Sequence, residues 1–177
     1  MLTTLPAALI ALRCAIAPIL IGLAWDGETG LGWVMLYSLA VLSDIFDGII
    51  ARRIGVSTAA LRTADSWADR ALYVCVAIAA WIAHRDVILA FQMPLWLILG
   101  LQGIWWFVNG VKYGKPASYH TYTAKAWGLT LWVAAIALFG YGYGGITLWI
   151  AIGMGLLHTI EEILMTSLLP TWQHDVL

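Results

Sequence analysis

Residues 31–83 read LGWVMLYSLAVLSDIFDGIIARRIGVSTAALRTADSWADRALYVCVAIAAWIA, and this stretch decides the fold. It contains two apolar runs, residues 31–51 and 63–83, each close to the ~20 residues that cross a bilayer as a helix. The short connection between the runs predicts two antiparallel neighbouring helices. Charged side chains gather where the runs meet: Asp44, Asp47, Asp65, Asp69, Arg52, Arg53, Arg62 and Arg70.

The rest of the chain repeats the apolar pattern. It is 62% hydrophobic and only 11% charged, with a mean hydropathy of +0.87, which excludes an ordinary soluble domain. The runs are continuous and lack the alternation of barrel strands, so they predict helices. Six such runs are present: 5–24, 31–51, 63–83, 91–111, 126–142 and 145–168. We therefore expect an all-α, polytopic membrane protein, with residues 1–177 forming one six-helix domain.

Basic residues predict how the helices are oriented. They concentrate in two of the connections between the runs. These residues are Arg52, Arg53 and Arg62 in one connection, and Lys112, Lys115 and Lys125 in the other. The positive-inside rule then places both connections and both termini in the cytoplasm. Tryptophans near the ends of the runs fit a belt at the membrane interface: Trp25, Trp33, Trp96 and Trp149.

The four aspartates occupy two helical faces. Positions 44, 47, 48 and 51 share one face, and positions 61, 65 and 69 share another. A single Asp at mid-membrane costs about 2.5–3.5 kcal/mol, and four together repel one another. A hard divalent cation offsets both effects, and Mg²⁺ typically combines a few carboxylates with substrate phosphates. The pattern therefore indicates a metal site and phosphate chemistry. The small residues at positions 48 and 51 either leave room for a ligand or serve helix packing.

These residues resemble a known signature. Asp44-Ile-Phe-Asp47-Gly48-Ile-Ile-Ala51-Arg52, eight further residues, Leu61, and Asp65-Ser-Trp-Ala-Asp69 are similar to DxxDGxxAR(x8)GxxxDxxxD of the CDP-alcohol phosphotransferase family. The one mismatch is Leu61, where the family has glycine. A second segment, LPAALIALR, resembles the family's P-N-x-x-T-x-x-R, retaining Pro6 and Arg13. Ala7 and Ile10 replace the asparagine and the threonine. Arg13 either pairs with an aspartate or reaches the interface.

The resemblance implies an activity. Family members transfer a substituted phosphate from a CDP-linked lipid, usually CDP-diacylglycerol, to a small alcohol and release CMP, as in phospholipid biosynthesis. It implies that Asp44, Asp47 and Asp65 hold one or two ions, Mg²⁺ or Mn²⁺. Asp69 would be a further metal contact and the catalytic base for the acceptor hydroxyl. The expected partners are the CDP-lipid, the alcohol, the bilayer and a second copy of the chain, without nucleic acid.

The resemblance also implies a nucleotide site at the cytoplasmic face of the cell membrane. Gly48, Ala51 and Arg52 would receive the cytidine and its phosphate, although Arg52 could instead reach the membrane interface. Leu61 would crowd the pocket. It therefore leaves open a catalytically impaired relative that still binds the CDP-lipid or the metal. A cation or proton transporter is the other alternative, but such a path would spread its acidic residues across the membrane.

Other polar residues leave alternatives open. The basic connection contains Lys112, Lys115, His120 and Lys125. It either binds an acceptor phosphate or lipid head groups, or only sets the topology. His158, Glu161 and Glu162 lie within the last apolar run, where charged groups are unusual. They either line a polar cavity or form hydrogen bonds between helices. The motif does not select the acceptor alcohol.

Overall fold

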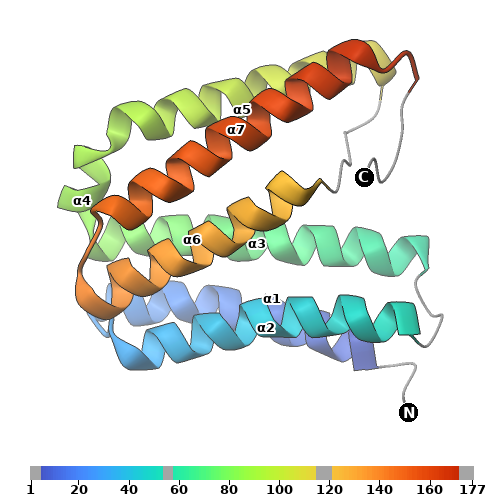
Figure 1. The fold of residues 1–177 in the computed structure, drawn as a ribbon. Helices are drawn as coiled ribbons and strands as arrows, with labels where there is room; N and C mark the ends of the chain where they lie inside the picture. The colour runs from blue at the N-terminus through green and yellow to red at the C-terminus, as the bar shows by residue number, and fades with distance from the viewer. Residues whose placement is uncertain (1–4, 54–57, 115–120, 172–177) are drawn as a thin grey trace. The chain divides into compact units, whose positions relative to one another are not determined.

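The computed structural model describes residues 5–53, 58–114 and 121–171 (Figure 1). Of these residues, 89% are helical, and none of them belongs to a strand. The helices are α1 (Leu5–Trp25), α2 (Leu31–Arg53), α3 (Ala59–Ala83), α4 (Arg85–Ala90), α5 (Gln92–Tyr113), α6 (Tyr122–Tyr141) and α7 (Ile146–Leu168). All of them except α4 are long and apolar enough to cross a membrane. The predicted all-α fold with six membrane-spanning helices is therefore confirmed.

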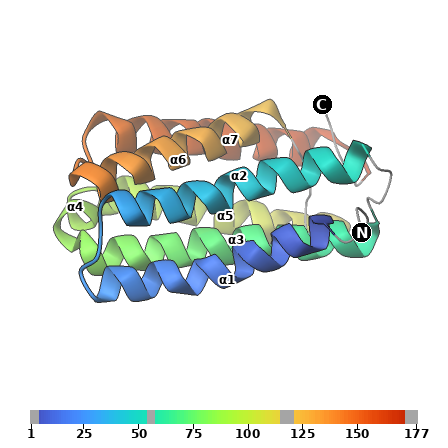
Figure 2. The ribbon, with the colours of Figure 1, turned by 90° about the horizontal axis from the view of Figure 1, so that it is seen from below.

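The helices form two compact units. Unit 1 comprises residues 1–88 with residues 138–143, and unit 2 comprises residues 89–137 with residues 144–177. In unit 1, α1 packs along both α2 and α3, as Figures 1 and 2 show. In unit 2, α5 packs along α7. The expected single domain stays a prediction.

An aromatic group fills the core of unit 1. Trp33 is 1% exposed, its indole Nε1 donates a hydrogen bond of 3.0 Å to the carbonyl of Leu20, and its ring stacks on Phe139 at 3.5 Å between centroids. Tyr37 lies one turn further along α2 and is equally buried. The prediction that Trp33 belongs to an interfacial belt is therefore wrong, because this residue ties α1 to α2 inside the protein.

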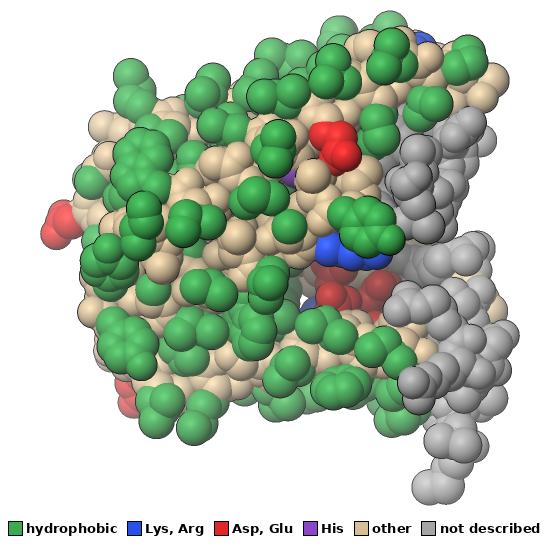
Figure 3. Space-filling view, viewed as in Figure 1, with side chains coloured by type: hydrophobic (Ala, Val, Ile, Leu, Met, Phe, Trp, Pro, Cys, Tyr) green, Lys and Arg blue, Asp and Glu red, His purple; other side chains and the backbone are tan. Residues whose placement is uncertain are grey.

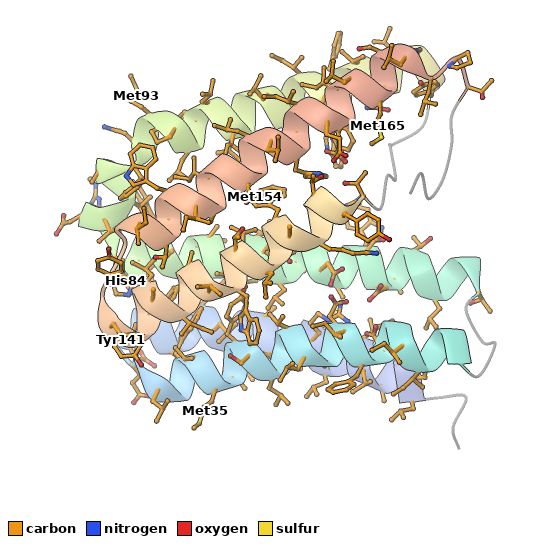
Figure 4. The ribbon with its side chains drawn as sticks, in the orientation of Figure 1. Met35, His84, Met93, Tyr141, Met154 and Met165 are labelled. Carbon is orange, nitrogen blue, oxygen red and sulfur yellow. The ribbon has the colours of Figure 1, made fainter. Side chains whose placement is uncertain are left out.

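Large hydrophobic side chains cover the outside of the helices (Figure 3). Met35 on α2 and Met93 on α5 point outward in Figure 4 and are 61% and 77% exposed. The other three tryptophans of the predicted belt are also exposed: Trp25, Trp96 and Trp149. Such surfaces are stable against lipid and would be a liability in water.

Helix α3 begins earlier than its apolar run. Thr58 is its N-cap, with an extended backbone and a side-chain oxygen that accepts a 3.2 Å hydrogen bond from the backbone N–H of Leu61. The helix therefore starts at Ala59 instead of the predicted residue 63. Leu61, Asp65 and Asp69 consequently lie on one continuous helix at successive turns.

Candidate metal and phosphate site

Three carboxylates converge in unit 1. Asp44 and Asp47 lie near the C-terminal end of α2, and Asp65 lies near the start of α3. Each offers one oxygen, and these oxygens all lie within 4.8 Å of one another. The spacing of the aspartates along two antiparallel helices therefore brings these three carboxylates together. Acidic side chains interrupt the hydrophobic surface in Figure 3.

Arg13, on α1, joins the cluster from a third helix. Its Nη1 lies 2.9 Å from Asp44 Oδ1 and 3.0 Å from Asp65 Oδ1, and it also pairs with Asp69. Its Nη2 pairs with Asp47. One guanidinium thus contacts all four aspartates, including Asp69, which is not among the three converging carboxylates. Of the two open interpretations of Arg13, the structure supports pairing with aspartates.

The cluster has a buried side and an open side. The side chains of Arg13 and Asp47 are 0% and 4% exposed, so they form its floor. The side chains of Asp44, Asp65 and Asp69 are 34–39% exposed and remain accessible. A ligand can therefore reach the three accessible carboxylates, while the buried pair of Arg13 and Asp47 fixes the relative positions of the helices that carry them.

The donor set fits a hard divalent cation. With all four carboxylates ionised, the cluster carries four negative charges, and the guanidinium supplies one positive charge. The excess of three negative charges in a poorly solvated place favours further cations. Carboxylate oxygens are the ligands that Mg²⁺ and Mn²⁺ prefer. The cluster can therefore hold a divalent metal ion, with Asp44, Asp47 and Asp65 as ligands.

The predicted nucleotide residues occupy adjoining positions. Gly48 follows Asp47 on α2 and is half-buried, and Leu61 is half-buried one turn before Asp65 on α3. Ala51 and Arg52 belong to the last turn of α2, but their side chains lie outside the described residues. Their roles stay predictions, as does that of Asp69 as a base.

Unit 2 contains a second polar group, between α6 and α7. Thr123 on α6 donates a hydrogen bond to Glu161, and its Oγ1 lies 3.1 Å from His158 Nδ1. The other imidazole nitrogen, His158 Nε2, lies 3.3 Å from Glu162 Oε2. These contacts support the interpretation that the polar residues of the last run form hydrogen bonds between helices.

Lys112 also has a structural partner. Its ammonium donates to three backbone carbonyls at the end of α7, those of Thr166, Ser167 and Leu169, at 2.5, 3.2 and 2.9 Å. Tyr113 donates to two of the same carbonyls. Lys112 therefore caps α7, where a cation also complements the helix dipole. Lys115 and His120 lie outside the described residues.

Sequence reasoning missed how central Arg13 is. The available signal was an arginine in the middle of an otherwise uncharged apolar run, residues 5–24, where a charge requires a partner. The sequence alone could not show that all four aspartates share this partner.

Comparison with known proteins identifies a family. The family model described as CDP-alcohol phosphatidyltransferase matches residues 3–157. No curated protein and no solved structure matches the chain. The family consists of transferases that move a phosphoryl-alcohol group from a CDP-alcohol, generally with a divalent metal ion.

Proposed function

Since the chain belongs to the CDP-alcohol phosphatidyltransferase family, we propose that it transfers a phosphatidyl group from CDP-diacylglycerol to a small alcohol in a Mg²⁺-dependent reaction. CMP is the second product, and the pathway is phospholipid biosynthesis. The observation that supports this proposal best is the convergence of carboxylate oxygens from Asp44, Asp47 and Asp65 within 4.8 Å. A diphosphate-bound divalent ion requires such a donor set.

The aspartates have two proposed roles, which are metal binding and proton transfer. Asp44, Asp47 and Asp65 would hold one or two ions, Mg²⁺ or Mn²⁺. When bound, such an ion neutralises the diphosphate and makes CMP a better leaving group. Asp69, accessible and adjacent, would be a further metal contact and would accept the proton of the acceptor hydroxyl. The alcohol oxygen then bonds to the β-phosphorus as the bond to the CMP oxygen breaks.

The nucleotide would lie beside the carboxylates. Gly48 and Ala51 leave space along α2 for the cytidine, and Arg52 would bind a phosphate as a cation. Leu61 narrows this region from α3. A lipid donor suits a membrane site, because its acyl chains remain in the bilayer while its head group meets the aspartates.

The orientation and assembly are part of the proposal. We place the protein in the cell membrane, and the distribution of basic residues supports an orientation with both termini and the active site on the cytoplasmic side. Cysteines introduced at positions 28 and 115, after replacement of Cys14 and Cys75, should be labelled from opposite sides of the membrane. Labelling from the same side would reject this topology. The family resemblance supports a homodimer.

The experiment that tests the function is CMP release by the purified protein. The protein in detergent receives CDP-diacylglycerol with a panel of small alcohols, and the lipid products are separated by chromatography. We expect CMP and one new phospholipid in Mg²⁺, and neither in excess chelator. The matched control is Asp86→Asn on α4, which removes a carboxylate outside the cluster and should keep activity.

The same experiment separates the alternatives. Metal binding without CMP release for any alcohol would reject the proposed transfer and favour the catalytically impaired relative. Ion flux through proteoliposomes without nucleotide would favour the transporter.

A further inference from the structure

We propose that Arg13 is a resident counter-cation of the aspartate cluster, whose guanidinium competes with the divalent metal ion for the oxygens of Asp44 and Asp65. Arg13 is then a positioning residue: it holds the four carboxylates together before metal binds and sets how tightly the metal binds. This inference rests on the metal site of the proposed function.

The competition follows from shared acceptor atoms. Arg13 Nη1 lies 2.9 Å from Asp44 Oδ1 and 3.0 Å from Asp65 Oδ1. Both residues belong to the group whose oxygens lie within 4.8 Å of one another. A metal ion bound through Oδ1 of Asp44 and Oδ1 of Asp65 would compete with the hydrogens on Arg13 Nη1 for the lone pairs of those two oxygens. Metal binding therefore requires Arg13 to give up part of its contacts with Asp44 and Asp65.

Arg13 cannot lose its positive charge by deprotonation when a divalent cation enters the cluster. A guanidinium stays protonated in proteins, and this one is 0% exposed, so it cannot turn into water without leaving the site. A divalent cation entering the cluster therefore meets a fixed positive charge. Repulsion between such charges is strong where solvent screening is weak. Arg13 thus lowers the affinity for metal while it stabilises the metal-free protein.

Arg13 can also give up its contacts with Asp44 and Asp65 without becoming unpaired. Its Nε–H is buried and has no hydrogen-bond partner among the described residues. Arg13 contacts only one oxygen of Asp47, Oδ2, and one of Asp69, Oδ1, so these two contacts can persist while a metal ion binds the other oxygens of the cluster. The exchange therefore leaves the guanidinium paired, which avoids the large cost of an isolated buried charge.

The test is a Mn²⁺ titration in detergent, without CDP-lipid, followed by electron paramagnetic resonance and by thermal unfolding. In Arg13→Met we expect a lower unfolding temperature without metal, affinity for Mn²⁺ tighter by about tenfold or more, and a larger stabilisation by Mn²⁺ than in wild type. Arg13→Lys keeps the charge but reaches fewer carboxylates at once, so its affinity should be intermediate.

The matched control is Arg85→Met. Arg85 belongs to the same unit, and its guanidinium lies over the ring of Trp81, 5.2 Å from the centroid. Removing this arginine should leave Mn²⁺ affinity unchanged, because it does not contact the cluster in the described structure. A change equal to that in Arg13→Met would show a general charge effect and overturn the inference.

The outcomes separate this inference from the proposed function. Unchanged or weaker Mn²⁺ affinity in folded Arg13→Met, or in Arg13→Lys if the first variant does not fold, rejects the competition. If neither variant folds, nuclear magnetic resonance of ¹⁵N-arginine wild type decides: Mg²⁺ must shift the Arg13 Nη signals, and unshifted signals reject the inference. Wild type that binds no Mn²⁺ rejects both proposals, whereas metal-dependent CMP release with unchanged affinity in the variants rejects only the role of Arg13.

Discussion

Arg13 and Asp47 form an ion pair in which both partners are shielded, with side chains that are 0% and 4% exposed. The pair joins the middle of α1 to the last third of α2. A buried pair of this kind depends strongly on both partners, because either charge left alone is poorly solvated. The other aspartates of the cluster keep about a third of their surface accessible. The pair therefore has a structural role in addition to the proposed metal contact of Asp47, while the other three carboxylates are more accessible to a ligand.

Asp47→Asn should reduce both stability and turnover. The substitution keeps the size of the side chain but removes its charge, so Arg13 loses its most shielded partner. Breaking a buried pair costs up to about 3–5 kcal/mol, and the three remaining carboxylates should keep the loss below that range. CMP release should fall by about a hundredfold or more, since a metal ligand is lost. Thermal unfolding and turnover at saturating Mg²⁺ measure the two effects.

Asp86→Asn serves as the control for this variant and should change neither quantity. Near-normal turnover in Asp47→Asn would contradict the assignment of this residue as a metal ligand.

Lys112→Met should destabilise unit 2 without changing substrate affinity. The ammonium donates to three carbonyls at the C-terminal end of α7, including that of Leu169 at 2.9 Å. Charge-assisted hydrogen bonds contribute about 1.5–3 kcal/mol each when one partner is removed, and Tyr113 retains part of the cap. Thermal unfolding measures the loss, with Lys125→Met as the control, because the ammonium of Lys125 lies over the ring of Tyr122. If Lys112 instead bound an acceptor phosphate, KM for the acceptor would rise while the unfolding temperature stayed constant.

Thr123→Val tests the hydrogen bonds between α6 and α7. Valine keeps the shape but leaves Glu161 and His158 without their shared hydroxyl. Such bonds contribute about 0.6 kcal/mol on average within membranes, and up to about 2 kcal/mol, so the unfolding temperature should fall. Thr147→Val is a matched control, because Thr147 Oγ1 is buried without a hydrogen-bond partner in the described structure. That variant should be neutral or more stable, and an equal loss in both would refute the role of the Thr123 hydroxyl.

The sequence predicted the helices well because each apolar run is long and continuous. All six runs match their helices within four residues at either end, and the short α4 between two of them was not predicted. Run 63–83 starts four residues late, because helix α3 continues through polar residues back to the cap at Thr58. Apolar periodicity cannot detect a helix that extends past its hydrophobic face.

Side-chain partners were harder to predict than helices. The position of Trp33 near a helix end suggests an interfacial residue, yet its partners Leu20 and Phe139 belong to two other helices. Arg13 shows the same limit, since its four partners come from two other helices. The spacing within each pair of aspartates could be interpreted, because both members of a pair lie on the same helix. Contacts between different helices depend on how the helices pack, which the spacing does not reveal.

Leu61→Gly addresses the one position where the chain departs from the family signature. Leu61 is half-buried one turn before Asp65, and its backbone N–H donates to the cap at Thr58. If its side chain narrows the nucleotide site, removing it should lower KM for CDP-diacylglycerol. Glycine also costs about 1 kcal/mol in helix stability, so thermal unfolding should show a loss. KM must therefore be compared at equal concentrations of folded protein.

Leu61→Ala separates the two effects of this substitution. Alanine shortens the side chain but keeps a strong helix former, so it should lower KM with little of glycine's backbone cost. If Leu61 instead contacts lipid or another helix, both variants lose stability and neither gains affinity for the donor. A KM that is unchanged or higher in Leu61→Ala would reject the crowding of the nucleotide. A lower KM in both variants would show that the leucine itself, and not the backbone at this turn, weakens donor binding.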